Sequence, residues 1–99
     1  NRDFQALVTE YCWGAGWGRG VLPKKTRSML NLAMLSALNR QHEFELHFKG
    51  AIRNGCTKEE IREVLFQVAI YAGVPAGNEA FLWAKDAMAG LEIKYGNLV

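Results

Sequence analysis

Apolar residues recur along most of this chain at intervals of three and four positions, the spacing that marks one face of an α-helix. Residues 57–73 show it most clearly, because Thr57 and Glu60 can form a capping box and the run stops at Gly73, just before Pro75. The apolar positions behind this cap are Ile61, Val64, Leu65, Val68, Ala69 and Ala72. Alternating patterns typical of strands are scarce. The sequence therefore predicts an all-α protein, a compact bundle of about five helices.

Three further segments complete the predicted helices. Residues 3–13 are expected to be helical and to end in a glycine-rich turn over residues 13–20. Residues 22–40 are apolar nearly all round between Met29 and Leu38, which predicts a helix in the centre of the bundle. Residues 75–91 place four apolar side chains on one face, namely Phe81, Ala84, Met88 and Leu91.

Residues 42–55 divide into three stripes at helical spacing. The predicted core stripe is Phe44, Phe48, Ala51 and Ile52. The predicted solvated stripe is His42, Glu45, Lys49 and Arg53. Between them runs a polar stripe along the edge of the core, made of Arg40, Glu43, His47, Gly50 and Asn54.

His47 is the candidate catalytic residue of this polar stripe. Glu43, four residues earlier, can accept a hydrogen bond from the imidazole and raise its pKa, and Gly50 leaves space beside the ring. The same spacing also suits an ordinary surface pair, so both interpretations stay open. A metal site is not expected, because His42 and His47 are five residues apart and no further ligand cluster accompanies them.

Length and composition narrow the remaining possibilities. The 99 residues predict a single domain, residues 1–99, with 49% hydrophobic and 22% charged residues. A net charge of +2 is too weak to predict nucleic-acid binding, and no apolar run reaches the length of a membrane span. Cys12 and Cys56 form no CxxC motif, which favours free thiols in a reducing cytoplasm.

Four stretches of the sequence together resemble the carboxymuconolactone decarboxylase family. They are "YCWGAGWGRGVLPKKTRSMLNLAML", "ALNRQHEFELHFKGAIRNG", "TKEEIREVLFQVAIYAGVPAGNEAF" and "WAKDAM", which span residues 11–88. The resemblance implies an alkylhydroperoxidase-D-like fold, a homo-oligomer of six subunits and a bacterial or archaeal cytoplasm. Members of the family usually carry a further N-terminal segment, which this chain is expected to lack.

The resemblance also implies an activity, the decarboxylation of 4-carboxymuconolactone to 3-oxoadipate enol-lactone in protocatechuate degradation. No cofactor is expected, because the substrate's own unsaturated lactone carbonyl can accept the electrons left by CO2. In this scheme His47, oriented by Glu43, hydrogen-bonds the lactone carbonyl or protonates the dienolate. Arg27 is the expected clamp for one carboxylate, and Arg40 either holds the other or pairs with Glu43.

The side chains expected to wall the substrate site are Trp13, Trp17 and Tyr71. Each of the binding roles has a plainer alternative: Arg27 bridging helix ends, Arg40 lying on the surface, and the tryptophans packing in the core or between subunits. Two other functions stay open for the whole chain. A thiol-dependent peroxidase is disfavoured, because Arg40 and Glu43 stand where the peroxidase relatives have the cysteines of a CxxC. The second open function is that of a family member that binds or converts another small organic acid.

Overall fold

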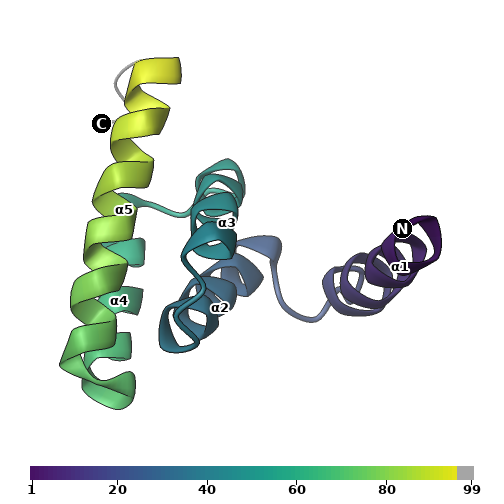
Figure 1. The fold of residues 1–99 in the computed structure, drawn as a ribbon, viewed down its shortest axis with the longest axis horizontal. Helices are drawn as coiled ribbons and strands as arrows, with labels where there is room; N and C mark the ends of the chain where they lie inside the picture. Colours follow the sequence, from purple (N-terminus) through teal and green to yellow (C-terminus); the bar gives the residue numbers. More distant parts are fainter. Residues whose placement is uncertain (96–99) are drawn as a thin grey trace.

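A computed structural model of the chain describes residues 1–95, with side chains through residue 93, and shows helices joined by short turns. In chain order the segments are α1 (Arg2–Val8), the π-helical η1 (Thr9–Trp17), α2 (Lys24–Ala37), α3 (Gln41–Arg53), α4 (Lys58–Ala72) and α5 (Val74–Tyr95). Helices α2 to α5 pack together as a body, and α1 with η1 forms an arm that extends away from it (Figure 1). The described residues contain no strand, which confirms the predicted all-α class.

Helix α4 begins and ends where its sequence signals predict. The Glu60 backbone N–H donates to Thr57 Oγ1 at 3.0 Å, and the Thr57 N–H donates to Glu60 Oε1 at 2.9 Å. These two bonds satisfy donors that the first turn of a helix otherwise leaves free. At the other end Gly73 has a φ of 111°, a left-handed conformation that glycine adopts without strain. The capping box and the glycine stop are therefore confirmed.

The core lies between the four helices of the body. Phe44, Phe48 and Ala51 of α3 are buried, which confirms the predicted core stripe, and Ile52 flanks them half-buried. Phe44 packs edge-on against Trp83 of α5, with ring centroids 5.5 Å apart. The other buried apolar side chains are Leu32, Cys56, Ile61, Leu65, Val68, Ala80, Ala87 and Leu91.

Two predicted faces need correction. In α2 the buried residues are Ser28, Leu32 and Ser36, whereas a stripe of Leu30, Met34 and Leu38 is exposed. The helix lies beside the other three without being enclosed by them, because a body of four helices leaves one side of α2 uncovered. In α5 the buried face is Ala80, Trp83, Ala87 and Leu91. Of the predicted positions only Leu91 is buried, and Phe81, Ala84 and Met88 flank this face half-buried.

The predicted glycine-rich turn over residues 13–20 is also partly wrong. The chain stays helical through Trp17, as a π-helix, and the turn begins only at Gly18. A Cβ at position 18 would lie 2.4 Å from the carbonyl oxygen of Gly14, so only glycine fits this close approach. Gly18 therefore ends the π-helix, whereas Gly14 and Gly16 lie within it.

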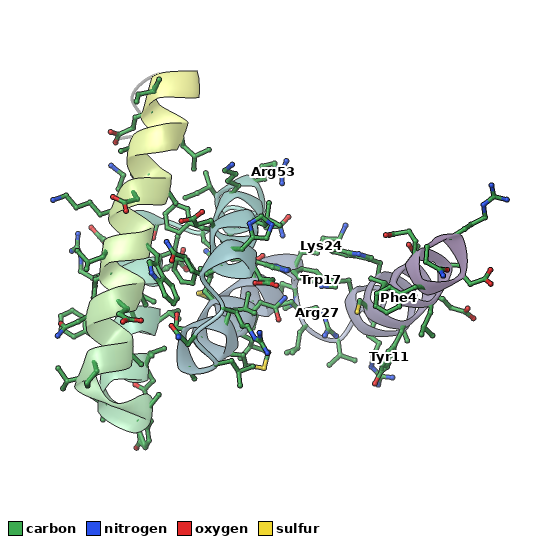
Figure 2. All side chains as sticks on the ribbon, in the orientation of Figure 1. Phe4, Tyr11, Trp17, Lys24, Arg27 and Arg53 are labelled. Carbon is green, nitrogen blue, oxygen red and sulfur yellow. The ribbon has the colours of Figure 1, made fainter. Side chains whose placement is uncertain are left out.

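Few contacts connect the arm to the body. No residue of α1 or η1 is buried, and Phe4 and Tyr11 project from the arm into solvent (Figure 2). The end of η1 nevertheless reaches α3, where Trp13 and Trp17 meet His47. Within the part of the chain that the structure describes, no helix combines the length and apolarity needed to cross a membrane.

Candidate active site

The end of the arm, the turn after it and the outer face of α3 enclose an open groove of about 980 Å³. The polar stripe of α3 forms one side, since His47, Gly50 and Asn54 all line the groove. A Cβ on Gly50 would meet nothing within 4 Å, so the space beside the imidazole is open, as the sequence predicted. The groove is large enough for a small organic acid.

Two indole rings flank His47 on the side of the arm. The ring centroid of Trp13 lies 6.5 Å from that of His47, and the centroid of Trp17 lies 6.4 Å from it, both with nearly parallel planes. The two indoles stack on each other at 5.5 Å. The structure therefore brings together three of the predicted site residues, although His47 is 30 or more positions from both tryptophans in sequence.

Burial lowers the pKa of His47 below its ordinary value of 6.5, because the charged imidazolium loses hydration beside the indoles. The nearby Glu43 carboxylate acts in the opposite direction and is the weaker influence. The influence of Glu43 has the predicted direction, but the predicted net rise in the pKa of His47 is wrong because burial outweighs it. The expected hydrogen bond is also missing, since the described residues show none between Glu43 and His47. The lowered pKa favours the neutral imidazole of His47 at pH 7.

Three cationic side chains line the same groove. Arg19 comes from the turn after η1, Lys24 from the first turn of α2, and Arg53 from the end of α3. Lys24 lies near Trp17 between the arm and the body, and Arg53 lies at one end of α3 (Figure 2). Among the residues that the structure describes, no Asp or Glu lines the groove. A cavity with this lining favours an anionic ligand.

A buried polar pair completes the groove. Asn54 Nδ2 donates a hydrogen bond of 2.9 Å to Ser28 Oγ, which joins the end of α3 to the first turns of α2. Ser28 is only 1% exposed, yet it lines the groove together with Asn54. Both are neutral hydrogen-bonding groups among the three cations.

Four predicted site residues do not line this groove, namely Arg27, Arg40, Glu43 and Tyr71. Arg27 is half-buried behind it, where its Nη2 donates to the carbonyl oxygen of Arg19 at 3.3 Å and its buried Nε has no partner within residues 1–95. Arg40 is exposed at the N-cap of α3, one turn before Glu43, which is also exposed. Tyr71 is 81% exposed near the end of α4.

The two cysteines occupy different surroundings. Cys12 is exposed on the arm, whereas Cys56 is buried in the core and its thiol donates to the carbonyl oxygen of Lys25 at 3.5 Å. Burial raises the pKa of the Cys56 thiol, which disfavours the reactive thiolate. Both thiols are free, as predicted. Within the described residues no three His, Cys, Asp or Glu side chains gather closely enough to hold a metal ion.

Sequence reasoning missed Arg19, Lys24, Arg53 and the Ser28–Asn54 pair as groove residues. Arg53 was assigned to the solvated stripe, and only its position at the end of α3 brings it to the groove. Arg19 and Lys24 carry no helical pattern that could have singled them out. The closeness of Trp17 and Arg19 in sequence was the one available signal, because side chains of one short turn often share a site.

The fold and the groove define an all-helical protein of the alkylhydroperoxidase-D-like class, with a histidine, two indoles and several cations around a small-molecule site. The chain belongs to the carboxymuconolactone decarboxylase family, whose model matches residues 2–86.

Three relatives can be compared along most of the chain. It is 39% identical to the 4-carboxymuconolactone decarboxylase of Acinetobacter baylyi, over 94% of this chain and 69% of that protein. It is 42% identical to the nitrosuccinic acid decarboxylase of Metarhizium robertsii, over 82% of this chain and 57% of the relative. An uncharacterized 15.0 kDa protein of Paracoccus denitrificans is 30% identical, over 85% of this chain and 64% of its own length.

Proposed function

We propose that this protein is a carboxy-lyase that converts 4-carboxymuconolactone to 3-oxoadipate enol-lactone without a cofactor. The family and its two named decarboxylases support the carboxy-lyase class. The observation that carries the proposal is the groove, in which the described lining residues include one histidine and three cations but no carboxylate. Such a site suits a small substrate with two carboxylates. A place in protocatechuate degradation in the cytoplasm belongs to the same proposal.

The reaction breaks one carbon–carbon bond. The departing carboxylate sits on the γ carbon of an α,β-unsaturated lactone, and its loss as CO2 leaves an electron pair on that carbon. The pair delocalises through the alkene onto the lactone carbonyl and gives a dienolate. One proton delivered to the α carbon then yields the enol-lactone. The protein must bind the carboxylates, stabilise the oxyanion and supply this proton.

His47 is the proposed proton donor. Burial in the groove lowers its pKa and favours the neutral ring at pH 7. A bound dianion stabilises the imidazolium and raises this pKa, so that substrate binding itself favours protonation of His47. The ring N–H can also hydrogen-bond the lactone carbonyl, where negative charge develops as CO2 leaves. Glu43, on the same stripe of α3, adds to the stabilisation of the imidazolium.

The proposed carboxylate ligands are Arg19, Lys24 and Arg53, because these cations line the groove. Arg27 takes a supporting role, since its hydrogen bond to the Arg19 carbonyl oxygen steadies the turn that carries Arg19. Trp13 and Trp17 form the proposed wall, where an apolar surface disfavours the localised charge of the departing carboxylate more than the delocalised dienolate. Arg40 and Tyr71, which lie outside the groove, have no contact role in this scheme.

Replacement of His47 tests the proposal most directly. His47→Ala is expected to lower kcat on 4-carboxymuconolactone by roughly 100-fold or more, the range of a positioned proton donor. The matched control is His42→Ala, which removes the exposed histidine of the same helix and should leave kcat unchanged. A His47→Ala enzyme that keeps its kcat within about threefold of the wild type rules out this assignment. A wild-type protein without activity on the lactone rules out the proposed function.

Decarboxylation of nitrosuccinic acid is a second candidate, supported by the 42% identity to the fungal enzyme of that name. Its chemistry is analogous, because a nitro group beside the departing carboxylate accepts the electron pair as a nitronate, as the unsaturated lactone does in the first case. Both substrates carry two carboxylates and suit the same cations. A comparison of kcat/KM for the two acids distinguishes the candidates. A thiol peroxidase is disfavoured, because Cys56 is buried in the core and the exposed Cys12 belongs to no CxxC pair.

Assembly into a homo-oligomer of six subunits is also part of the proposal. The exposed stripe of Leu30, Met34 and Leu38 on α2 and the apolar side chains of the arm support it, since large apolar surfaces often mark subunit contacts.

A further inference from the structure

Helix α2 carries two buried serines, which lie eight positions apart and bond differently. Ser28 and Ser36 are each 1% exposed. The hydroxyl of Ser36 donates to the carbonyl oxygen of Leu32 at 2.6 Å, a bond within its own helix. The hydroxyl of Ser28 instead accepts a hydrogen bond from the Asn54 side chain of α3 at 2.9 Å.

This difference leaves Ser28 with an unused proton. A hydroxyl has one proton to donate and two lone pairs that can accept, and the Asn54 amide occupies one of the lone pairs. Within residues 1–95 the Ser28 proton has no acceptor. A buried polar group usually has its hydrogen bonds satisfied, and Ser28 lines the groove. The missing acceptor can therefore come from a ligand in the groove.

The neighbours of this pair indicate what kind of acceptor it receives. Lys24 lies one helical turn before Ser28 on α2, and Arg53 directly precedes Asn54 on α3. Both cations line the same groove. A neutral donor in a groove that two cations also line suits a carboxylate, because hydrogen bonds to charged oxygens are the stronger ones.

We propose that the Ser28 hydroxyl donates a hydrogen bond to a carboxylate of the small dicarboxylic acid bound in the groove, and that Asn54 is the positioning residue that orients this hydroxyl. By filling a lone pair of Ser28, the Asn54 amide keeps the proton directed away from α3 and toward the groove. Ser28 and Asn54 thereby make the groove selective for an acid that places a carboxylate between Lys24 and Arg53. The identity of the acid as a decarboxylase substrate rests on the proposed function, whereas its binding does not.

Calorimetric titration with muconate, a six-carbon unsaturated dicarboxylate, tests the proposal without requiring turnover. Ser28→Ala is expected to raise the Kd for muconate roughly 10-fold to 100-fold, the effect of losing a hydrogen bond to a charged group. Ser36→Ala is the matched control, since it removes an equally buried hydroxyl of the same helix and should leave the Kd within about twofold. Equal Kd values for Ser28→Ala and the wild type would overturn the proposal.

The positioning role of Asn54 has its own measurement. Asn54→Ala should weaken muconate binding in the wild-type background, because the Ser28 hydroxyl is then free to turn to its own helix. In the Ser28→Ala background the same change should have little effect, so the two losses are not additive. Fully additive losses would show that Asn54 acts without Ser28. Asn54 is only half-buried, so Asn54→Ala remains a usable variant if Ser28→Ala folds poorly, and an unchanged Kd for muconate in the wild-type background would by itself overturn the positioning role.

Kinetics on 4-carboxymuconolactone separate this inference from the proposed function. The carboxylate contact exists before and during the reaction, so Ser28→Ala should raise KM and leave kcat nearly unchanged. A wild-type protein that binds muconate through Ser28 but does not decarboxylate the lactone disproves the proposed function alone. An active protein whose KM and Kd are both unaffected by Ser28→Ala disproves this inference alone. A wild-type protein that neither binds muconate nor acts on the lactone disproves both.

Discussion

The four-helix body and the N-terminal arm use apolar residues in different ways. In the body the helices pack mainly apolar side chains against one another, and Phe44 is completely buried at their centre. In the arm Phe4 is 63% exposed, and the arm contacts His47 through the two indoles at its end. The body therefore provides the free energy of folding, whereas the end of the arm completes the groove. Stability and function depend on different parts of a small chain.

The largest expected difference concerns one phenylalanine from each part. Phe44→Ala should lower the free energy of unfolding by about 3–5 kcal/mol, because it leaves a cavity in the core. Phe4→Ala should change it by less than about 0.5 kcal/mol in the single chain, since an exposed side chain loses few contacts. Urea unfolding at a protein concentration where sedimentation shows monomers measures both. A cost above 2 kcal/mol for Phe4→Ala would mean that the arm packs on the body.

The two helix caps give a smaller contrast of the same kind. Thr57 caps α4 in the body, and Asn1 caps α1 in the arm, where its Oδ1 accepts from the backbone N–H groups of Asp3 and Phe4. Thr57→Ala should lower the free energy of unfolding by about 1 kcal/mol. Asn1→Ala should leave it unchanged, because fraying of α1 does not open the core. Similar losses for the two variants in thermal unfolding would contradict the separation of arm and body.

The smallest effect is the influence of the arm on His47. Removing both indoles, as Trp13→Ala with Trp17→Ala, should raise the pKa of His47 toward its ordinary value of 6.5, because water returns to the ring. A pH titration followed by NMR measures this pKa, and Phe4→Ala serves as the control from the same arm. An unchanged pKa in the double variant would mean that the body alone buries His47.

The same pKa sets the direction of a pH effect on stability. The folded pKa of His47 lies below the unfolded value of 6.5, so the unfolded chain binds the proton more readily. The contribution of His47 to stability is complete above about pH 6.5 and declines as the pH falls through the lowered folded value. The indole-free variant should show a weaker decline over this window.

Much of the body could be predicted from the sequence, because periodicity and caps are local signals. The capping box of α4, the core stripe of α3 and the all-α class are confirmed. The errors occurred where tertiary surroundings decide the outcome. A helix apolar all round, such as α2, does not indicate which of its sides the other helices cover, and the buried face of α5 is displaced by one position.

The candidate site divides in the same way. The sequence by itself determined the polar stripe of α3, which includes His47, Gly50 and Asn54, because helical spacing alone puts them on one face. The structure alone decided which side chains from elsewhere meet this stripe. Trp13, Trp17 and Arg19 reach the stripe because the π-helix carries the chain on to Gly18. Ser28 reaches it because α2 packs beside α3. Local periodicity fixes a face, but the packing of distant segments determines what that face contacts.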